Sequence, residues 1–213
     1  MDTGFRTGSK IRIAALTALA ASALGLAIVA WAQTPPAAGA KQLETAHLTP
    51  AGNMLKPEGL ESWIFLGTSL GMGYNPGSFN ADHPGQFQVV LMEPNAYRHF
   101  VQTGSYAPGS MFLLNFFNSD TQKRSINQNG FTQADLTNFE IHVIDPKGSE
   151  GHAFYLFGAN DKEGNPTPPG STCVRCHVGH GAFNGTFAQF YPTLRPMIPK
   201  DALERAAQDH NIR

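Results

Sequence analysis

The chain has 213 residues, 41% of them hydrophobic and 15% charged, which suits one compact domain with an N-terminal extension. The formal net charge is −1, and removing residues 1–32 leaves 12 basic against 15 acidic residues, a net charge of −3. This balance gives no electrostatic footprint for nucleic acid or for an anionic membrane surface, so neither is an expected partner.

Residues 1–32 have the pattern of a secretory signal peptide. Its basic side chains come first, at Arg6, Lys10 and Arg12. An apolar run follows over residues 13–29, and Ala30-Trp31-Ala32 then places small residues at the two positions that signal peptidase inspects. We expect cleavage before Gln33 and export to the periplasm. The alternative is an uncleaved membrane anchor, because residues 13–32 are long enough to span a bilayer as a helix.

A flexible linker is expected between this segment and the folded part. Residues 33–42 contain Pro35, Pro36 and several alanines, and they show no periodic apolar face. Residues 43–213 contain no internal repeat, and clusters of Gly and Pro mark the turns between their expected elements. One domain over 43–213 is therefore predicted.

The first part of this domain is predicted to contain both helices and a strand. Residues 57–65 predict a helix with Pro57 early in its first turn, and residues 67–77 predict a loop. Residues 86–92 predict a strand. Residues 94–103 predict a covering helix that the next residue, a glycine, ends.

Three further strands are expected. Residues 110–117 are apolar on both faces, which is typical of a central strand. Residues 138–144 alternate between apolar and polar side chains, which is typical of a half-buried antiparallel strand, and residues 153–157 supply another strand. Short strands with helices toward the two ends predict an α+β domain, with a mainly antiparallel sheet and flanking helices.

The two cysteines lie in the motif C-x-x-C-H, formed by Cys173, Cys176 and His177. Two thiols one helical turn apart can add to the two vinyl groups of a porphyrin, and the following imidazole can bind the iron. We therefore expect one covalent haem c, with His177 as the proximal axial ligand of the iron, on a C-terminal haem-attachment helix. Export agrees with this interpretation, because such haem attachment takes place outside the bacterial cytoplasm.

Two other uses of the cysteines are weaker hypotheses. A structural zinc ion needs two further ligands at metal-site spacing, and His180 alone does not complete a convincing set. A dithiol redox pair normally begins a helix after an early strand, whereas this pair lies near the end of the domain.

At these residues the sequence resembles the cytochrome P-460 family, which includes the cytochromes c′-beta. The likeness rests on residues 173–192, CVRCHVGHGAFNGTFAQFYP, and more loosely on residues 63–68, WIFLGT. The resemblance implies an exported protein with one c-type haem on a mainly antiparallel domain. It also implies a homodimer, and an iron with a His on one side and an open position on the other.

The resemblance leaves two activities open. Family members named for hydroxylamine oxidation carry an additional bond from a lysine to the porphyrin, whereas cytochromes c′-beta lack it and bind nitric oxide. The strand at 110–117, where that lysine is expected, contains none, and Lys123 is the only lysine near it in sequence. Asn184 also departs from the acid expected there. Binding of nitric oxide is therefore favoured, with a periplasmic electron-transfer partner.

Other residues keep different classes of function open. Met197 could be a sixth iron ligand, which would give a six-coordinate electron-transfer cytochrome. A peroxidase-like enzyme would need a distal base and an arginine. Histidines on candidate amphipathic elements, each by default a surface or satisfied residue, are His99, His142 and His152. His180 is expected to bond a carbonyl or a haem propionate, and Arg98 could pair with a propionate.

Overall fold

The computed structural model describes residue 43 and residues 45–72, 84–121 and 130–208. The predicted signal peptide at 1–32, the predicted linker at 33–42 and Lys123 all lie outside these residues. The chain divides into two compact units, Met1–Gly39 and Ala40–Arg213, and every described residue belongs to the second. Within the described ranges, no helix is both long enough and apolar enough to cross a bilayer.

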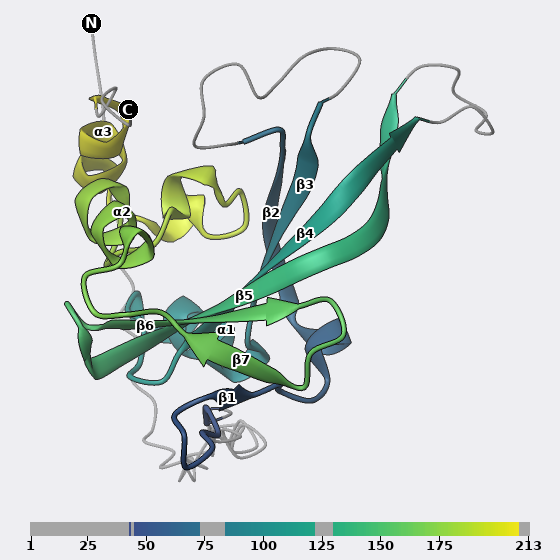
Figure 1. Ribbon diagram of the computed structural model, residues 1–213. Helices are drawn as coiled ribbons and strands as arrows, with labels where there is room; N and C mark the ends of the chain where they lie inside the picture. Colours follow the sequence, from purple (N-terminus) through teal and green to yellow (C-terminus); the bar gives the residue numbers. More distant parts are fainter. Residues whose placement is uncertain (1–42, 44, 73–83, 122–129, 209–213) are drawn as a thin grey trace, which may run out of the picture. The chain divides into compact units, whose positions relative to one another are not determined.

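The second unit is built on a seven-stranded antiparallel sheet, in the order β1-β7-β6-β5-β4-β3-β2 (Figure 1). The strands are β1 Met54–Leu55, β2 Ile64–Leu70, β3 Gln86–Met92, β4 Met111–Thr121, β5 Phe131–Ser149, β6 His152–Gly158 and β7 Glu163–Pro166. The α-helices are α1 Pro94–Thr103, α2 Thr172–His180 and α3 Lys200–Gln208, and the 3₁₀ turns are η1 Leu60–Ser62, η2 Ala188–Phe190 and η3 Arg195–Met197. The predicted α+β class with a mainly antiparallel sheet is confirmed.

Strand β3 and helix α1 have the bounds that the sequence predicts, because the signals at both ends of the helix are strong. The Glu93 carboxylate accepts hydrogen bonds from the backbone N–H groups of Asn95 and Ala96, 2.9 and 2.6 Å away. Pro94 occupies the first turn, and Gly104 ends the helix in the left-handed conformation, with φ 72°. These caps satisfy backbone groups that the helix itself leaves without partners.

The predicted helix at 57–65 and the start of the predicted loop at 67–77 are wrong. Strand β2 covers residues 64–70, and only η1 is helical in this region. The strand pairs with β3 from Ile64 opposite Met92 to Leu70 opposite Phe87, and Leu66 is fully buried. Pairing with a neighbouring strand and burial of this side chain therefore override the local helix signals.

Different sets of residues pack against the two faces of the sheet. Odd-numbered residues of β4 and β5, such as Leu113 and Ile141, pack in a cluster that contains Met54 and Trp63. The even-numbered Phe112 lies on the opposite face and joins a second cluster with residues of α1, η2 and α3. Helices α2 and α3 and the 3₁₀ turns after α2 lie together on this second side (Figure 1). The even-numbered face is therefore the one that the C-terminal segment covers.

Cross-strand register sets which side chains stand next to one another on that face. One row runs from Met92 through Phe112 and His142 to Phe154. The next row places Val90 beside Leu114 and Leu114 beside Glu140. Apart from Met92, the residues of these two rows line a cavity that faces helix α2.

Candidate haem site

Helix α2 carries both cysteines of the motif. Ser171 caps it by accepting a hydrogen bond from the backbone N–H of Val174, 3.5 Å away. Val174 is buried, with 2% of its surface exposed, and anchors the helix, whereas the thiols of Cys173 and Cys176 are half-buried and not joined to each other. The two thiols are one helical turn apart on a helix whose orientation is fixed by the core.

The state of these thiols argues against dithiol redox chemistry. Burial is the largest cause that raises the pKa of Cys173 and the sole cause that raises that of Cys176. Reactive redox cysteines show the opposite shift, because a stabilised thiolate is the nucleophile. Among the described residues there is also no cluster of three or more His, Cys, Asp or Glu side chains that could hold a metal ion such as zinc.

The ring of His177 is oriented by a backbone carbonyl. Its Nδ1 lies 2.7 Å from the carbonyl oxygen of Gly185. A carbonyl oxygen only accepts, so Nδ1 carries the hydrogen and Nε2 keeps its lone pair. Burial lowers the pKa of His177 to about 4, so the imidazole is neutral near pH 7. A neutral imidazole with an available Nε2 is the form that binds a metal ion.

The carbonyl of Gly185 is held in place by a tight turn over residues 183–186. Thr186 donates through its backbone N–H and its hydroxyl to the carbonyl of Phe183, at 2.9 and 2.8 Å. The hydroxyl of Tyr106 lies 3.0 Å from the Thr186 hydroxyl, and burial raises the pKa of Tyr106 to about 12. Asn184 takes a positive φ of 44° in this turn. The turn is thus tied to the core of the domain.

Two histidines that sequence reasoning did not place at the site lie beside His177. His142 on β5 and His152 on β6 are buried, with 6% and 7% of their surface exposed, and their Nε2 and Nδ1 atoms are 2.9 Å apart. Burial, and then the neighbouring His177 and His152, lower the pKa of His142 well below its usual value. Burial also lowers the pKa of His152. Both are therefore satisfied, neutral side chains and not surface residues.

A cavity opens between α2, the sheet and the segment after α2. The motif residues Cys173, Cys176 and His177 line it from the helix. Apolar and aromatic side chains form most of the remaining wall, namely Val90, Phe112, Leu114, Phe154, Phe187, Phe190 and Tyr191. The polar side chains on this wall include Gln88 and Glu140. A flat, largely apolar group with a metal at its centre suits this lining.

Gln88 and Glu140 differ in how they are held on this wall. Gln88 donates from Nε2 to the carbonyl of Met72, 2.7 Å away, and is fixed by that bond. Burial raises the pKa of Glu140 above its ordinary value. Glu140 is the only carboxylate among the described residues that line the cavity. It is therefore the acid best placed to exchange a proton with a molecule bound there.

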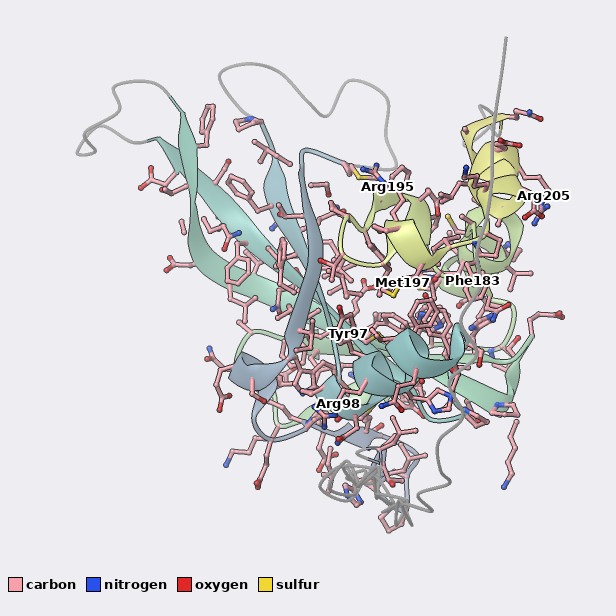
Figure 2. All side chains as sticks on the ribbon, turned by 180° about the vertical axis from the view of Figure 1, so that it is seen from behind. Tyr97, Arg98, Phe183, Arg195, Met197 and Arg205 are labelled. Atoms are coloured by element: carbon pink, nitrogen blue, oxygen red, sulfur yellow. The ribbon has the colours of Figure 1, made fainter. Side chains whose placement is uncertain are left out.

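Several residues that the sequence singled out lie away from the cavity. Met197 packs against the core cluster around Phe100, as does Phe183 (Figure 2). Arg98 is exposed and donates to the side chain of Asn95 on its own helix, α1. His99, also on α1, is not part of the cavity lining.

His180 is the last residue of α2. Its backbone carbonyl accepts a hydrogen bond from Gln189 Nε2, 3.0 Å away, and Gln189 Oε1 accepts one from the backbone N–H of Ala182 at the same distance. These bonds join the end of α2 to the segment that contains η2. They therefore stabilise the wall of the cavity that Phe187 and Phe190 contribute.

The donor set and the cavity fit a haem. Both thiols and the imidazole lie on one helix and line one cavity, and the Nδ1 hydrogen bond leaves Nε2 for the iron. The fold and this site together define a haem-binding cytochrome built on an antiparallel sheet. The chain belongs to the cytochrome P460 family, whose family model matches residues 57–188. This match covers the sheet from β2 onward, the C-x-x-C-H motif and the turn at Gly185. No curated protein matches the chain.

Proposed function

We propose that this protein is an exported mono-haem c-type cytochrome with a five-coordinate iron that binds nitric oxide. In this proposal Cys173 and Cys176 form the thioether bonds to one haem, and His177 Nε2 is the proximal ligand. The observation that carries it is the placement of both thiols and the His177 ring on one cavity, with Nδ1 already donating to Gly185. A bound haem would supply an iron with an open coordination position and one-electron redox chemistry.

The wall of the cavity supports an open position on the iron. His142 lines the cavity, but its Nε2 already lies 2.9 Å from His152. Met197, the sixth ligand that the sequence suggested, packs in the core. Val90 and Leu114, side by side on the sheet, offer apolar surface to a small uncharged molecule. A diatomic gas such as nitric oxide requires no charged partner in such a pocket.

The lining also supports nitric oxide binding over hydroxylamine oxidation. No lysine is found among the described residues that line the cavity, so nothing there could form the additional bond to the porphyrin. The strand at 110–117, where the family resemblance leads us to expect that lysine, contributes Phe112 and Leu114 to the lining. Lys123 lies outside the described residues.

One observation favours hydroxylamine oxidation as a second candidate. Oxidising hydroxylamine removes protons together with electrons, so the reaction needs a nearby proton acceptor. Glu140 lines the cavity, and burial raises its pKa toward the range in which a carboxyl group can both accept and release a proton. Glu140 would take the proton, and an external electron acceptor would take the electrons through the haem.

Localisation and partners belong to the same proposal. The periplasm follows from the signal peptide that residues 1–32 predict, and a membrane attachment follows only if that segment stays uncleaved. A homodimer rests on the family resemblance. A periplasmic electron-transfer partner follows from the need to supply or remove electrons at the iron.

The first experiment is an absorption spectrum of the dithionite-reduced full-length protein, with and without nitric oxide or carbon monoxide. A high-spin band that shifts on ligand addition supports the proposal. A sharp low-spin spectrum that ignores both gases would instead indicate a six-coordinate electron carrier. A strongly red-shifted band would indicate a lysine cross-link and hydroxylamine chemistry.

The haem linkage is tested by a pyridine haemochrome spectrum after acid-acetone extraction. The unmutated protein should retain its haem, and the double variant C173S/C176S should release it. Ser105→Ala, a change of an exposed residue just beyond α1, is the control and should retain the haem. Extraction of the haem from the unmutated protein would overturn the covalent assignment.

A further inference from the structure

The buried pair His142–His152 has no role in attaching a haem, yet it lies against His177. His142 and His152 are ten residues apart, on the neighbouring strands β5 and β6, and their nitrogens are 2.9 Å apart. Burying two imidazoles requires that their polar atoms find partners, and an apolar pair would have avoided that need. Two aromatic side chains without polar atoms would fill the same space, so packing alone does not explain why two hydrogen-bonded histidines stand here.

The pair belongs to a closed ring of contacts around His177. The His142 ring stands edge-on to the His177 ring, with centroids 4.8 Å apart and an interplanar angle of 70°. On its other side His142 bonds to His152. The His152 ring packs against Gly185, and the carbonyl of Gly185 accepts the hydrogen from His177 Nδ1. Each member therefore limits the movement of the next.

Glycine is required at position 185 for this contact. A Cβ atom at this residue would lie 2.4 Å from His152 Nε2 and 2.5 Å from His152 Cε1. The backbone of Gly185 also has a φ of 63°, which L side chains rarely adopt. The absence of a side chain lets the His152 ring pack directly on the peptide whose carbonyl orients His177.

The His142 ring is itself fixed on two sides. It stacks on Phe154, with centroids 4.3 Å apart and planes 12° apart, and on Phe112, with centroids 5.7 Å apart and planes 28° apart. All three residues stand on one row of the sheet. The sheet therefore sets the position of His142, and the hydrogen bond between the two histidines in turn fixes the ring of His152.

We infer that His142 and His152 are positioning residues for the axial ligand, holding the Gly185 carbonyl and the plane of the His177 ring in one orientation. The inference rests on the proposed function, since it takes His177 as the ligand of the iron. Outer groups of this kind fix the tautomer and direction of a ligating imidazole and raise its basicity. His142 and His152 do so through Gly185 and through ring contact, without touching the iron.

The test uses the haem-loaded, full-length protein and two substitutions of His152. His152→Leu removes both the bond to His142 and the ring against Gly185. His152→Asn keeps a polar atom at the place of Nδ1, so it retains the bond to His142 while removing the rest of the ring. The control is His47→Leu, the same change at an exposed histidine. Pyridine haemochrome spectra first establish that each protein carries covalent haem.

Two properties of the haem iron, measured in its ferrous and ferric states, report on whether His142 and His152 position His177. In His152→Leu we expect the iron–histidine stretching band in resonance Raman spectra to broaden and shift to lower frequency. We also expect the reduction potential to rise, because a less basic imidazole stabilises ferric iron less. His152→Asn should lie between His152→Leu and the unmutated protein, and His47→Leu should match the unmutated protein.

The outcomes separate this inference from the proposed function. If His152→Leu carries covalent haem and keeps both the band and the potential of the unmutated protein, the positioning role is overturned and the function stands. If His152→Leu does not fold, His152→Asn decides on the same two readouts. Absence of covalent haem from the unmutated protein overturns both.

Discussion

The imidazole Nδ1 of His177 lies 2.7 Å from the carbonyl oxygen of Gly185, eight residues further along the chain. A short loop after α2 therefore returns to the helix and fixes the ring of its histidine. Because this contact depends on one peptide group, the backbone at 185 should be sensitive to the smallest possible substitution.

Gly185→Ala is predicted to destabilise the protein more than Gly104→Ala does. Both glycines have a positive φ, 63° and 72°, so each substitution should cost about 1–2 kcal/mol for the left-handed backbone. Only at Gly185 does the added Cβ meet the His152 ring, which should add about 1–3 kcal/mol of overpacking. Thermal unfolding of the two variants measures the difference. Equal losses of stability would contradict the packing of His152 on Gly185.

Glu140→Gln is predicted to stabilise the protein at pH 7 but not at pH 4. Burial raises the pKa of Glu140 in the folded state, so the folded protein binds this proton more tightly than the unfolded chain does. The unfolding free energy therefore falls as pH rises from the ordinary carboxyl pKa through the raised value. Glutamine removes this dependence. Denaturant unfolding at both pH values checks it, with Glu163→Gln, at an exposed residue of β7, as the control.

Met197→Leu is predicted to leave the reduced absorption spectrum unchanged and to cost less than about 1.5 kcal/mol, because Leu has a similar volume. Met197 packs against the core and is not part of the cavity lining. Met72 lines the cavity and is 48% exposed, so Met72→Leu is the matched variant. A change from low-spin to high-spin iron in either variant would identify that methionine as a sixth ligand and contradict the open position.

Phe100→Ala is predicted to destabilise the domain by about 3–5 kcal/mol. Phe100 is fully buried, stacks on Tyr106 at a centroid distance of 4.7 Å and meets Phe183 edge-on at 5.9 Å. It therefore joins α1 to the turn that holds Gly185. Val101→Ala, at the next residue, is the control, because Val101 is 49% exposed and its loss should stay within about 0.5 kcal/mol. Calorimetric unfolding of both variants measures the contrast.

The sequence predicts elements well where local signals agree with tertiary packing. Pro94 and Gly104 bound α1, and both ends lie where the pattern predicts them. The region at 57–65 shows the opposite case. Its Pro and Glu residues favour a helix, but β2 gains strand pairing with β3 and buries Leu66. The short strands β1 and β7 went unpredicted, because each is defined mainly by its pairing with a neighbouring strand. Helix α3 was also missed, although its Ala, Leu, Glu and Arg residues are strong helix formers and give a local signal.

The residues of the site also divide into those that the sequence predicts and those that it does not. The motif at 173–177 identifies the thiols and the imidazole, because their spacing follows from the chemistry of a porphyrin. The alternation at 138–144 predicts that Glu140 and His142 face solvent, whereas α2 and the segment after it cover that face. One signal was available: β4 is apolar on both faces, so its neighbour β5 should also be covered on both. The partnership of His142 with His152 depends on strand register and could not be predicted from composition.

The close packing of Gly67 on β2 bears on how the site is assembled. A Cβ there would lie 2.9 Å from the carbonyl oxygen of Phe190 and 3.0 Å from Pro192 Cδ, so the C-terminal segment docks directly onto the strand backbone. All seven strands are complete by Pro166, before any motif residue emerges during synthesis or translocation. The floor of the cavity can thus form first, and the segment with both thiols and His177 closes over it last. The order of residues along the chain therefore allows a cofactor to be attached after the sheet has folded and before the C-terminal segment docks onto it.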